Sequence, residues 1–282
     1  MSTTSICFLN GDYLPLEDAR VSVLDRGFIF GDGIYEVIPV FGGRAFRLPE
    51  HVRRLERSLA AVGIESPLPA AAWAELVDSL LTRNALRDAS IYLQITRGVA
   101  PRNHAAPSAC RPTVFAMASA LMSPGAVQPV AAISMPDLRW QRCDIKAISL
   151  LPNVMARTEA TAAGAYEAVL FRDGMLTEGA ASNVFVVKDG RVLTPPHSPF
   201  ILPGITRDAI CEALATSPDA VQEVPITRET VETAEELWLT SSTRDLVPVA
   251  TLDGKPVGSG APGPVFRRVL ARYLEFKAKA LA

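Results

Sequence analysis

The stretch NVFVVKDGRVL, residues 183–193, is the strongest local indicator of the fold. Two apolar runs, 183–187 and 191–193, flank Asp189-Gly190, a pair that supplies the positive φ angles of a tight hairpin turn. A hairpin joins antiparallel strands, whereas consecutive strands of a doubly wound fold are parallel and separated by helices. The stretch therefore predicts an antiparallel or mixed sheet in this half of the chain.

Other segments on both sides of this hairpin follow the same logic. A second hairpin is expected from 168–171 and 175–177, and a third from 34–40 and 44–48, with Pro39 interrupting its first strand. Further strands are expected at 90–97 and 112–120, and helices at 49–63, 71–86, 152–163, 205–215 and from 264 onward. Strands and helices come in clusters and do not alternate strictly. The sequence therefore predicts an α+β fold with mixed or antiparallel sheets.

The run Met122-Ser123-Pro124-Gly125-Ala126 breaks both the strand and the helix patterns. It marks a domain boundary. We expect a smaller N-terminal α/β domain at 1–121, a linker at 122–127 and a larger C-terminal domain at 128–282. At 282 residues the chain is long enough for two modest domains that each bury a core.

The composition excludes several classes of protein. The net charge of −2 and the pI near 6.0 provide no basic field to recruit nucleic acid or an anionic membrane. No window approaches about eighteen uninterrupted apolar residues, so no membrane span is expected, and the N-terminus lacks the pattern of a secretory signal. Four scattered cysteines form no Cys-x-x-Cys pair, which is typical of reduced thiols in the cytoplasm. None of the three histidines has metal-ligand spacing, so no metal site is predicted.

Lysine is scarce, with five lysines among 28 basic residues, and each one can be assessed as a catalytic amine. Lys188 and Lys255 lie beside Asp-Gly turns, and Lys277 and Lys279 lie on the last expected helix; all four are explained as solvated. Lys146 lies in the apolar, strand-like stretch CDIKAISLL (143–151). An exposed edge strand is the alternative for this single residue.

Four further segments carry candidate binding residues. The run RGFIFGDGIYE (26–36) is not a dinucleotide fingerprint, and we interpret it as a loop that delivers Tyr35 into a cavity. PGITRD (203–208) is typical of a helix N-terminus, where free amides bind anions. The hydroxyl cluster TSST (240–243) offers further phosphate donors or satisfies a turn. The loop PRNH (101–104) offers an arginine and a histidine to a carboxylate or is simply solvated.

Taken in order, these segments resemble one family. The motifs RGFIFGDGIYEV, EHVRRL, TRGVAPRNH, RCDIKAISLL, LTEGAASNVF, LPGITRD and LTSSTRDLVPV are similar to the successive motifs of fold type IV pyridoxal-phosphate aminotransferases, from about residue 10 to residue 260. Within this family the loop 101–104 and the run 142–146 most resemble D-amino-acid aminotransferases. The resemblance implies two domains with pyridoxal 5′-phosphate between them, and a homodimer. It also implies ping-pong transfer of the amino group from D-alanine or D-glutamate to pyruvate or 2-oxoglutarate.

The resemblance also implies roles for individual residues. Lys146 bonds covalently to the cofactor and then moves a proton at the substrate Cα. Glu178 pairs with the pyridine nitrogen, and Leu202 packs near the ring. The residues implied to hold the phosphate are Arg54, Ile205, Thr206, Ser242 and Thr243. The residues implied to bind the substrate carboxylate are Tyr35, Arg102 and His104, the last two reaching across from a partner subunit.

Four alternatives, and a departure from the family, remain open at this point. Ala180 and Ala181 stand where related enzymes carry hydroxyl residues, which leaves the hydrogen bonds around the cofactor or Glu178 open. The same fold would also suit a branched-chain L-amino-acid or an (R)-amine aminotransferase, and aminodeoxychorismate lyase is more distant. A non-catalytic binding protein would require every motif to be coincidental.

Overall fold

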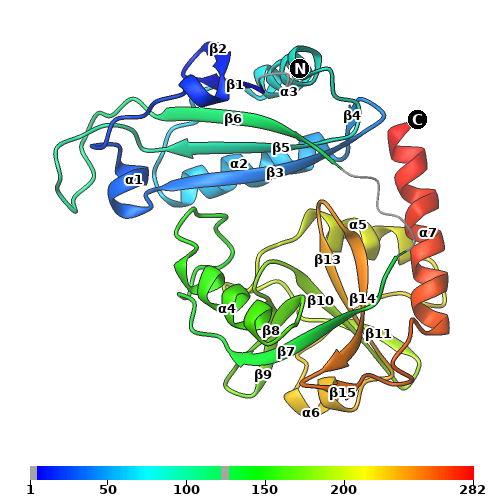
Figure 1. Ribbon diagram of the computed structural model, residues 1–282. Helices are drawn as coiled ribbons and strands as arrows, with labels where there is room; N and C mark the ends of the chain where they lie inside the picture. Colours follow the sequence, from blue (N-terminus) through cyan, green and yellow to red (C-terminus); the bar gives the residue numbers. More distant parts are fainter. Residues whose placement is uncertain (1–4, 122–126) are drawn as a thin grey trace. The chain divides into compact units, whose positions relative to one another are not determined.

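The computed structural model describes residues 5–121 and 127–282, and the chain divides into two compact units (Figure 1). The first unit contains residues 5–121 together with the short segment 145–149, and the second contains 127–144 and 150–280. The expected linker, 122–127, lies outside the described residues except for its last position. The segment 145–149 follows the expected boundary in sequence but packs with the first unit.

The first unit is a six-stranded sheet in the order β2-β1-β6-β5-β3-β4, and every pairing in it is antiparallel. In chain order its elements are β1 (Ile6–Leu9), β2 (Asp12–Pro15), the 3-10 helix η1 (Leu16–Asp18), α1 (Arg26–Phe30), β3 (Gly33–Phe41), β4 (Arg44–Ala45), α2 (Leu48–Ala61), α3 (Ala70–Asn84), β5 (Ala89–Thr96) and β6 (Thr113–Ala120).

Helices α2 and α3 cover one face of this sheet, and the core of the unit lies between them and the strands. Val52, Leu55 and Leu59 recur at three and four residues along α2, so they share one helix face and are all buried. On β3 the alternate residues Ile34 and Ile38 point to the same side and meet them. The apolar spacing in the sequence thus specifies which face of each element is buried.

The second unit is a nine-stranded mixed sheet in the order β12-β11-β10-β13-β14-β7-β8-β9, with β15 paired to β14. Its elements are β7 (Val130–Pro136), α4 (Leu151–Ala162), β8 (Glu167–Arg172), β9 (Met175–Gly179), β10 (Asn183–Lys188), β11 (Arg191–Thr194), α5 (Ile205–Leu214), β12 (Gln222–Glu223), α6 (Arg228–Glu232), β13 (Glu236–Ser241), β14 (Asp245–Leu252), β15 (Lys255–Pro256) and α7 (Pro264–Leu281). Strand β7 is parallel to both of its neighbours, and β11 is parallel to β12, while the remaining pairs are antiparallel.

The hairpin expected at 183–193 is present as β10 and β11. Asp189 and Gly190 have φ angles of 51° and 69°, as a tight primed turn requires. The expected α+β fold with mixed and antiparallel sheets is confirmed.

Four sequence expectations about local structure are wrong. The run 26–30, expected to be a loop, forms α1, because the Asp25 carboxylate accepts the Gly27 N–H and caps the helix. Pro39 does not interrupt β3; its strand continues to Phe41. Lys277, expected to be solvated, is buried and pairs with Asp245.

The fourth concerns the stretch 143–151, which is not a strand. Residues 143–150 are irregular, with one isolated bridge, Ala147 to Ile34, and Leu151 begins α4. Within this stretch Ile145 is buried in the core of the first unit, so this residue is covered without a strand of its own.

Candidate active site

Lys146 is fixed to the start of β3 through its backbone. The N–H of Tyr35 donates to the Lys146 carbonyl at 2.9 Å, and the N–H of Ile148 donates to the Gly33 carbonyl at 3.0 Å. A side chain at Gly33 would approach the Ile95 carbonyl to 2.7 Å, so glycine is needed for this close contact. The Lys146 Nζ lies 4.1 Å from the centroid of the Tyr35 ring. Two predicted site residues, Lys146 and Tyr35, are therefore in contact.

Arg54 belongs to a buried ionic cluster on α2 and β3. Its Nε and Nη2 donate to the two carboxylate oxygens of Glu36 at 2.7 and 2.8 Å, and His51 Nδ1 lies 2.8 Å from the same carboxylate. Burial by itself would raise the pKa of Glu36, but the Arg54 cation and the His51 hydrogen bond hold it well below its ordinary value. Burial lowers the pKa of His51. Arg54 is thus held rigidly and is not solvated.

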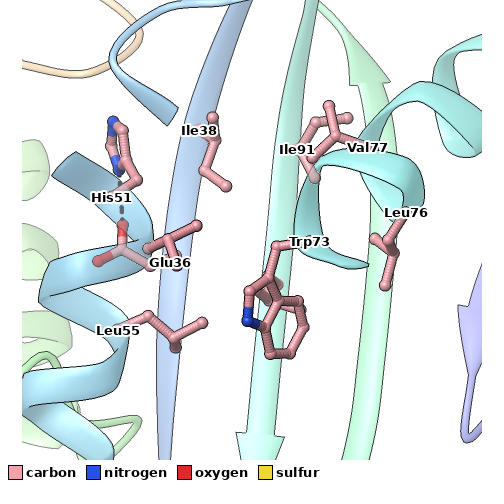
Figure 2. A pocket seen from close by; sticks show the side chains of 10 residues that line it. Glu36, Ile38, His51, Leu55, Trp73, Leu76, Val77 and Ile91 are labelled. Carbon is pink, nitrogen blue, oxygen red and sulfur yellow. Dashed lines mark hydrogen bonds and ion pairs between the residues drawn. The ribbon is translucent and has the colours of Figure 1, made fainter. Parts of the chain in front are cut away.

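A small pocket adjoins this cluster, and Figure 2 shows Glu36 and His51 at its edge with Trp73 across from them. Apart from those three residues its lining is entirely aliphatic. The Trp73 Nε1 is buried and has no hydrogen-bond partner among the described residues. An apolar lining of this kind suits neither a phosphate nor a carboxylate, so the pocket belongs to the core of the first unit.

Arg102 and His104 lie together on the exposed loop 101–105. The Arg102 guanidinium carbon lies 5.6 Å from the centroid of the Phe30 ring. The centroid of the His104 ring lies 5.4 Å from the same Phe30 centroid. Both side chains therefore gather around one aromatic ring on α1. Two adjacent donors on a single loop suit a carboxylate ligand.

Glu178, at the end of β9 in the second unit, is buried and accepts hydrogen bonds on both oxygens. Oε1 accepts from Arg139 Nη1, and Oε2 accepts from Asn183 Nδ2 and from the Leu202 N–H, the last two at 3.0 Å. Burial raises the pKa of Glu178 to about 7, against the opposing effects of Arg139 and the Leu202 amide. The carboxyl group is thus balanced between its two protonation states near neutral pH.

Arg139 is held in turn by Asp137. Nε and Nη2 of Arg139 donate to the two Asp137 oxygens, both at 2.9 Å, and Nη2 also donates to the Phe200 carbonyl at 3.0 Å. Burial by itself would raise the pKa of Asp137, but the Arg139 hydrogen bonds hold it below its ordinary value. Neither residue was predicted from the sequence. The sequence feature that could have indicated them is an acidic and a basic residue two positions apart, directly after the strand β7.

Ala180 and Ala181, which lack hydroxyl groups, do not leave Glu178 without partners. The N–H of Ala180 donates to the Ala168 carbonyl at 2.9 Å, and the N–H of Ala181 donates to Glu167 at 3.3 Å. The hydrogen bonds to the Glu178 carboxyl come instead from Arg139, Asn183 and Leu202.

The predicted phosphate residues of the second unit lie at the start of α5 and after β13. Ile205 and Thr206 are the first two residues of α5, and its N-cap Gly204 offers no side chain to the helix amides. A Cβ at Gly204 would lie 1.9 Å from the Asn183 Oδ1, so only glycine fits. Ser242 and Thr243 are half-buried in the turn after β13.

The Thr240 hydroxyl provides a test of whether an anionic group fits this unit. Thr240 is 2% exposed, and its Oγ1 has no hydrogen-bond partner among the described residues. Thr240 pairs directly with Asn183, so the two side chains lie on the same face of the sheet. A buried hydroxyl without a partner is costly, and a bound acceptor would satisfy it. Together with the uncapped α5 amides, this donor set fits a phosphate.

Comparisons with known proteins show which family the chain resembles. Residues 33–252 match the family model of amino-transferase class IV. The chain is 40% identical over 262 residues to a D-alanine aminotransferase of Bacillus licheniformis, covering 92% of this chain and 93% of that one. A branched-chain amino acid aminotransferase from Thermoproteus uzoniensis, solved with norvaline, superposes with a TM-score of 0.88 at 26% identity, covering 98% and 96% of the two chains. One from Escherichia coli gives a TM-score of 0.89 at 27% identity, covering 97% and 94%.

The family expected from the sequence motifs is thereby confirmed. Its model spans most of the chain, and the relatives align over nearly the full length of both proteins. A further branched-chain amino acid aminotransferase of the same fold, at a TM-score of 0.90, was solved with pyridoxamine 5′-phosphate. The protein therefore belongs to the class IV aminotransferases and is a pyridoxal-phosphate-dependent aminotransferase.

Proposed function

We propose that this enzyme transfers amino groups between D-amino acids and 2-oxo acids, with D-alanine and D-glutamate as donors and pyruvate and 2-oxoglutarate as acceptors, in a ping-pong cycle. The observation that carries the proposal is the loop 101–105, which presents Arg102 and His104 side by side. The 40% identical relative, a D-alanine aminotransferase, supports the same substrate class.

Lys146 is proposed to attach the cofactor and to move the proton at the substrate Cα. When bound, pyridoxal phosphate withdraws electrons from the bonds to that carbon, so that the proton can leave. The amine must be held in place to act as a base. The two backbone hydrogen bonds between 146–148 and the start of β3 provide this fixation.

Glu178 is proposed to pair with the pyridine nitrogen and keep it protonated. Three donors already orient its carboxyl group, and a fourth, positively charged partner would shift a group with a pKa of about 7 to the carboxylate form. Arg139 supports the same form, because its charge lies against the Oε1 atom. Leu202, whose N–H donates to Oε2, is proposed to pack near the ring.

The phosphate is proposed to be held by Ile205, Thr206, Ser242, Thr243 and Arg54. The uncapped amides of α5 and the unsatisfied Thr240 hydroxyl support the phosphate contacts proposed for the residues of the second unit. Arg54 brings a charge, and its fork is already fixed by Glu36. These residues would contact the phosphate of the cofactor, and the substrate would take no part in these contacts.

Tyr35, Arg102 and His104 are proposed to bind the substrate α-carboxylate. An unpaired buried carboxylate is costly, so a site for it requires fixed donors. A carboxylate held on one side, with Lys146 acting from one face, allows only one enantiomer to present its Cα–H to the amine. The D-enantiomer follows from the resemblance of the loop 101–104 to D-amino-acid enzymes.

We further propose a cytoplasmic homodimer. Val21, Val23, Leu24 and Phe28, on α1 and just before it, are 46–73% exposed, so several large apolar side chains close together in the sequence are open to solvent. A second copy of the chain would cover them, and sedimentation should then give about 61 kDa, twice 30.3 kDa. The four cysteines carry no disulfide, as in a reducing compartment.

A donor panel tests the proposed substrates. The purified enzyme is supplied with D-alanine, D-glutamate, L-leucine or (R)-1-phenylethylamine, and the conversion of the cofactor is followed by its absorbance. We expect rapid conversion with both D-amino acids and little with the other donors. Rapid conversion with L-leucine and none with D-alanine would favour the branched-chain activity of the structural neighbours. Conversion with (R)-1-phenylethylamine alone would favour an (R)-amine aminotransferase.

A further inference from the structure

The loop 101–105 is exposed along its whole length and would be conformationally free without outside support. Inside the loop, the N–H of Ala105 donates to the Asn103 side chain at 3.1 Å, a local turn that does not anchor the loop to the sheet. The support has to come from a residue outside the loop.

Arg26, the first residue of α1, provides that support. Its Nη1 donates to the Asn103 carbonyl at 2.6 Å, and its Nη2 donates to the His104 carbonyl at 3.3 Å. The Arg26 side chain is buried, with Arg26 only 4% exposed, although the loop is exposed. Because both acceptors are main-chain atoms, these bonds fix the path of the backbone that carries Arg102 and His104.

Asp32, just beyond α1, holds the same guanidinium from the other side. The Arg26 Nε donates to Asp32 Oδ2 at 2.8 Å, and Arg97 donates to both Asp32 oxygens at 2.7 and 3.1 Å. Burial by itself would raise the pKa of Asp32, but Arg97 and Arg26 hold it below its ordinary value. The ionised Asp32 carboxylate therefore orients the Arg26 guanidinium and keeps it directed toward the loop.

Helix α1 is itself fixed to the sheet. The Asp25 carboxylate accepts the Gly27 N–H at 2.7 Å and the hydroxyls of Thr96 and Thr113 at 3.0 and 2.7 Å. A Cβ at Gly27 would lie 2.2 Å from the Thr96 Cγ2, so the helix packs directly against β5 with no room for a side chain at this position. Phe30 on the same helix contacts both Arg102 and His104.

We propose that Arg26 is a positioning residue for the substrate carboxylate: oriented by Asp32, it holds the loop 101–105 so that Arg102 and His104 are in place before the substrate arrives. This rests on the proposed carboxylate-binding role of those two residues. It assigns a function to the charged residues of the run 26–32, which cofactor binding alone does not explain. Preorganised donors bind a ligand more tightly, because less freedom is lost on binding.

The test uses the holoenzyme with Arg26→Met, which keeps an unbranched apolar stem but removes the guanidinium, and Arg26→Lys, which keeps the charge but not the guanidinium fork. Arg20→Met is the matched control, since Arg20 also donates to two carbonyls, but to those of its own neighbours Glu17 and Ala19. KM and kcat for D-alanine and pyruvate are measured. Each substitution is also made in a variant that already carries Arg102→Ala and His104→Ala.

We expect Arg26→Met to raise KM at least about tenfold with kcat changed by less than about threefold, and Arg26→Lys to restore little of the loss. Arg20→Met should behave as wild type. In the background without Arg102 and His104, Arg26→Met should have no further effect, because it acts through them. An unchanged KM in Arg26→Met, full rescue by lysine, or a loss that simply adds in that background would overturn the proposal.

A second measurement does not depend on the substrate. Because Arg26 holds the backbone of Asn103 and His104, releasing the loop should speed tryptic cleavage after Arg102. We expect Arg26→Met to speed that cleavage at least about tenfold relative to cleavage after Lys279, at the exposed end of α7, with both read by mass spectrometry. An unchanged ratio would show that Arg26 does not hold the loop. If the ratio rises while Arg102→Ala leaves KM unchanged, Arg26 holds the loop but the carboxylate-binding role of Arg102 is wrong.

Discussion

Lys146 illustrates how a reactive side chain is prepared by its surroundings at the scale of one residue. Its backbone is bonded to Tyr35, and its amine lies over the face of the Tyr35 ring. A ring face attracts a cation, so it draws the flexible side chain toward one place. The other lysines are held differently: Lys277 pairs with a carboxylate, and Lys188 donates to a main-chain carbonyl.

Replacing Lys146 with alanine should remove the covalent bond between protein and cofactor. Borohydride reduction followed by mass spectrometry should then find no cofactor attached to any lysine, and turnover should fall by several orders of magnitude. Lys188→Ala, which removes a remote lysine, should retain both the adduct and the activity. An adduct on another lysine in Lys146→Ala, with normal turnover, would contradict the assignment.

Glu178 should make the stability of the cofactor-free protein depend on pH. Its folded pKa of about 7 lies above the ordinary value of 4.5, so the protonated form is favoured in the folded state. The corresponding stability is fully present below pH 4.5 and is lost as the pH rises to about 7, by about 3 kcal/mol at most. Glutamine cannot ionise, so Tm of Glu178→Gln minus Tm of wild type should increase between about pH 5 and pH 8. A difference that stays constant with pH would show that Glu178 does not titrate in this range.

At the scale of elements, the start of α5 depends on one close contact. Gly204 has an ordinary φ of −72°, so its backbone would accept any residue, but a Cβ there would collide with the Asn183 side chain. Asn183 in turn donates to Glu178 and to the Leu202 carbonyl. The position of the α5 amides and the orientation of Glu178 are thus linked through one amide side chain.

Gly204→Ala should therefore weaken cofactor binding. Displacing Asn183 removes a hydrogen bond to a buried carboxylate, worth about 1.5–3 kcal/mol, so we expect at least about a tenfold loss of affinity for pyridoxal phosphate, measured by titrating the cofactor-free protein. Gly190→Ala is the control, since nothing lies within 4 Å of a Cβ there; it should lower Tm slightly and leave the affinity unchanged. Wild-type affinity in Gly204→Ala would contradict the link.

At the scale of the whole molecule, each unit is stabilised by contacts between elements far apart in the sequence. In the second unit, Asp245 at the start of β14 accepts from the Tyr273 hydroxyl and from Lys277 Nζ, both at 2.6 Å, and so connects the strand to α7. All three side chains are largely buried.

None of the described helices is long and apolar enough to cross a bilayer.

Lys277→Met should lower Tm by about 5 °C or more. Removing one partner of a buried ion pair leaves the other charge without compensation, at a cost of about 3 kcal/mol or more. Lys279→Met, on an exposed position of the same helix, should change Tm by no more than about 1–2 °C. Equal effects of the two substitutions would show that the pair with Asp245 contributes nothing to stability.

The sequence by itself determined the local elements and the family. Asp-Gly turns select hairpins through backbone φ angles, and apolar spacing selects the buried faces of α2 and β3, because both effects act within a few residues. The ordered motifs identified the family, and with it the cofactor.

Only the tertiary structure decided how remote groups meet. The docking of 145–149 onto the first unit, the Arg139–Glu178 pair and the hold of Arg26 on the loop join residues tens of positions apart. The burial of Lys277 was equally invisible in the sequence. Such contacts depend on how elements pack in space, and neither periodicity nor turn chemistry encodes a partner at that separation.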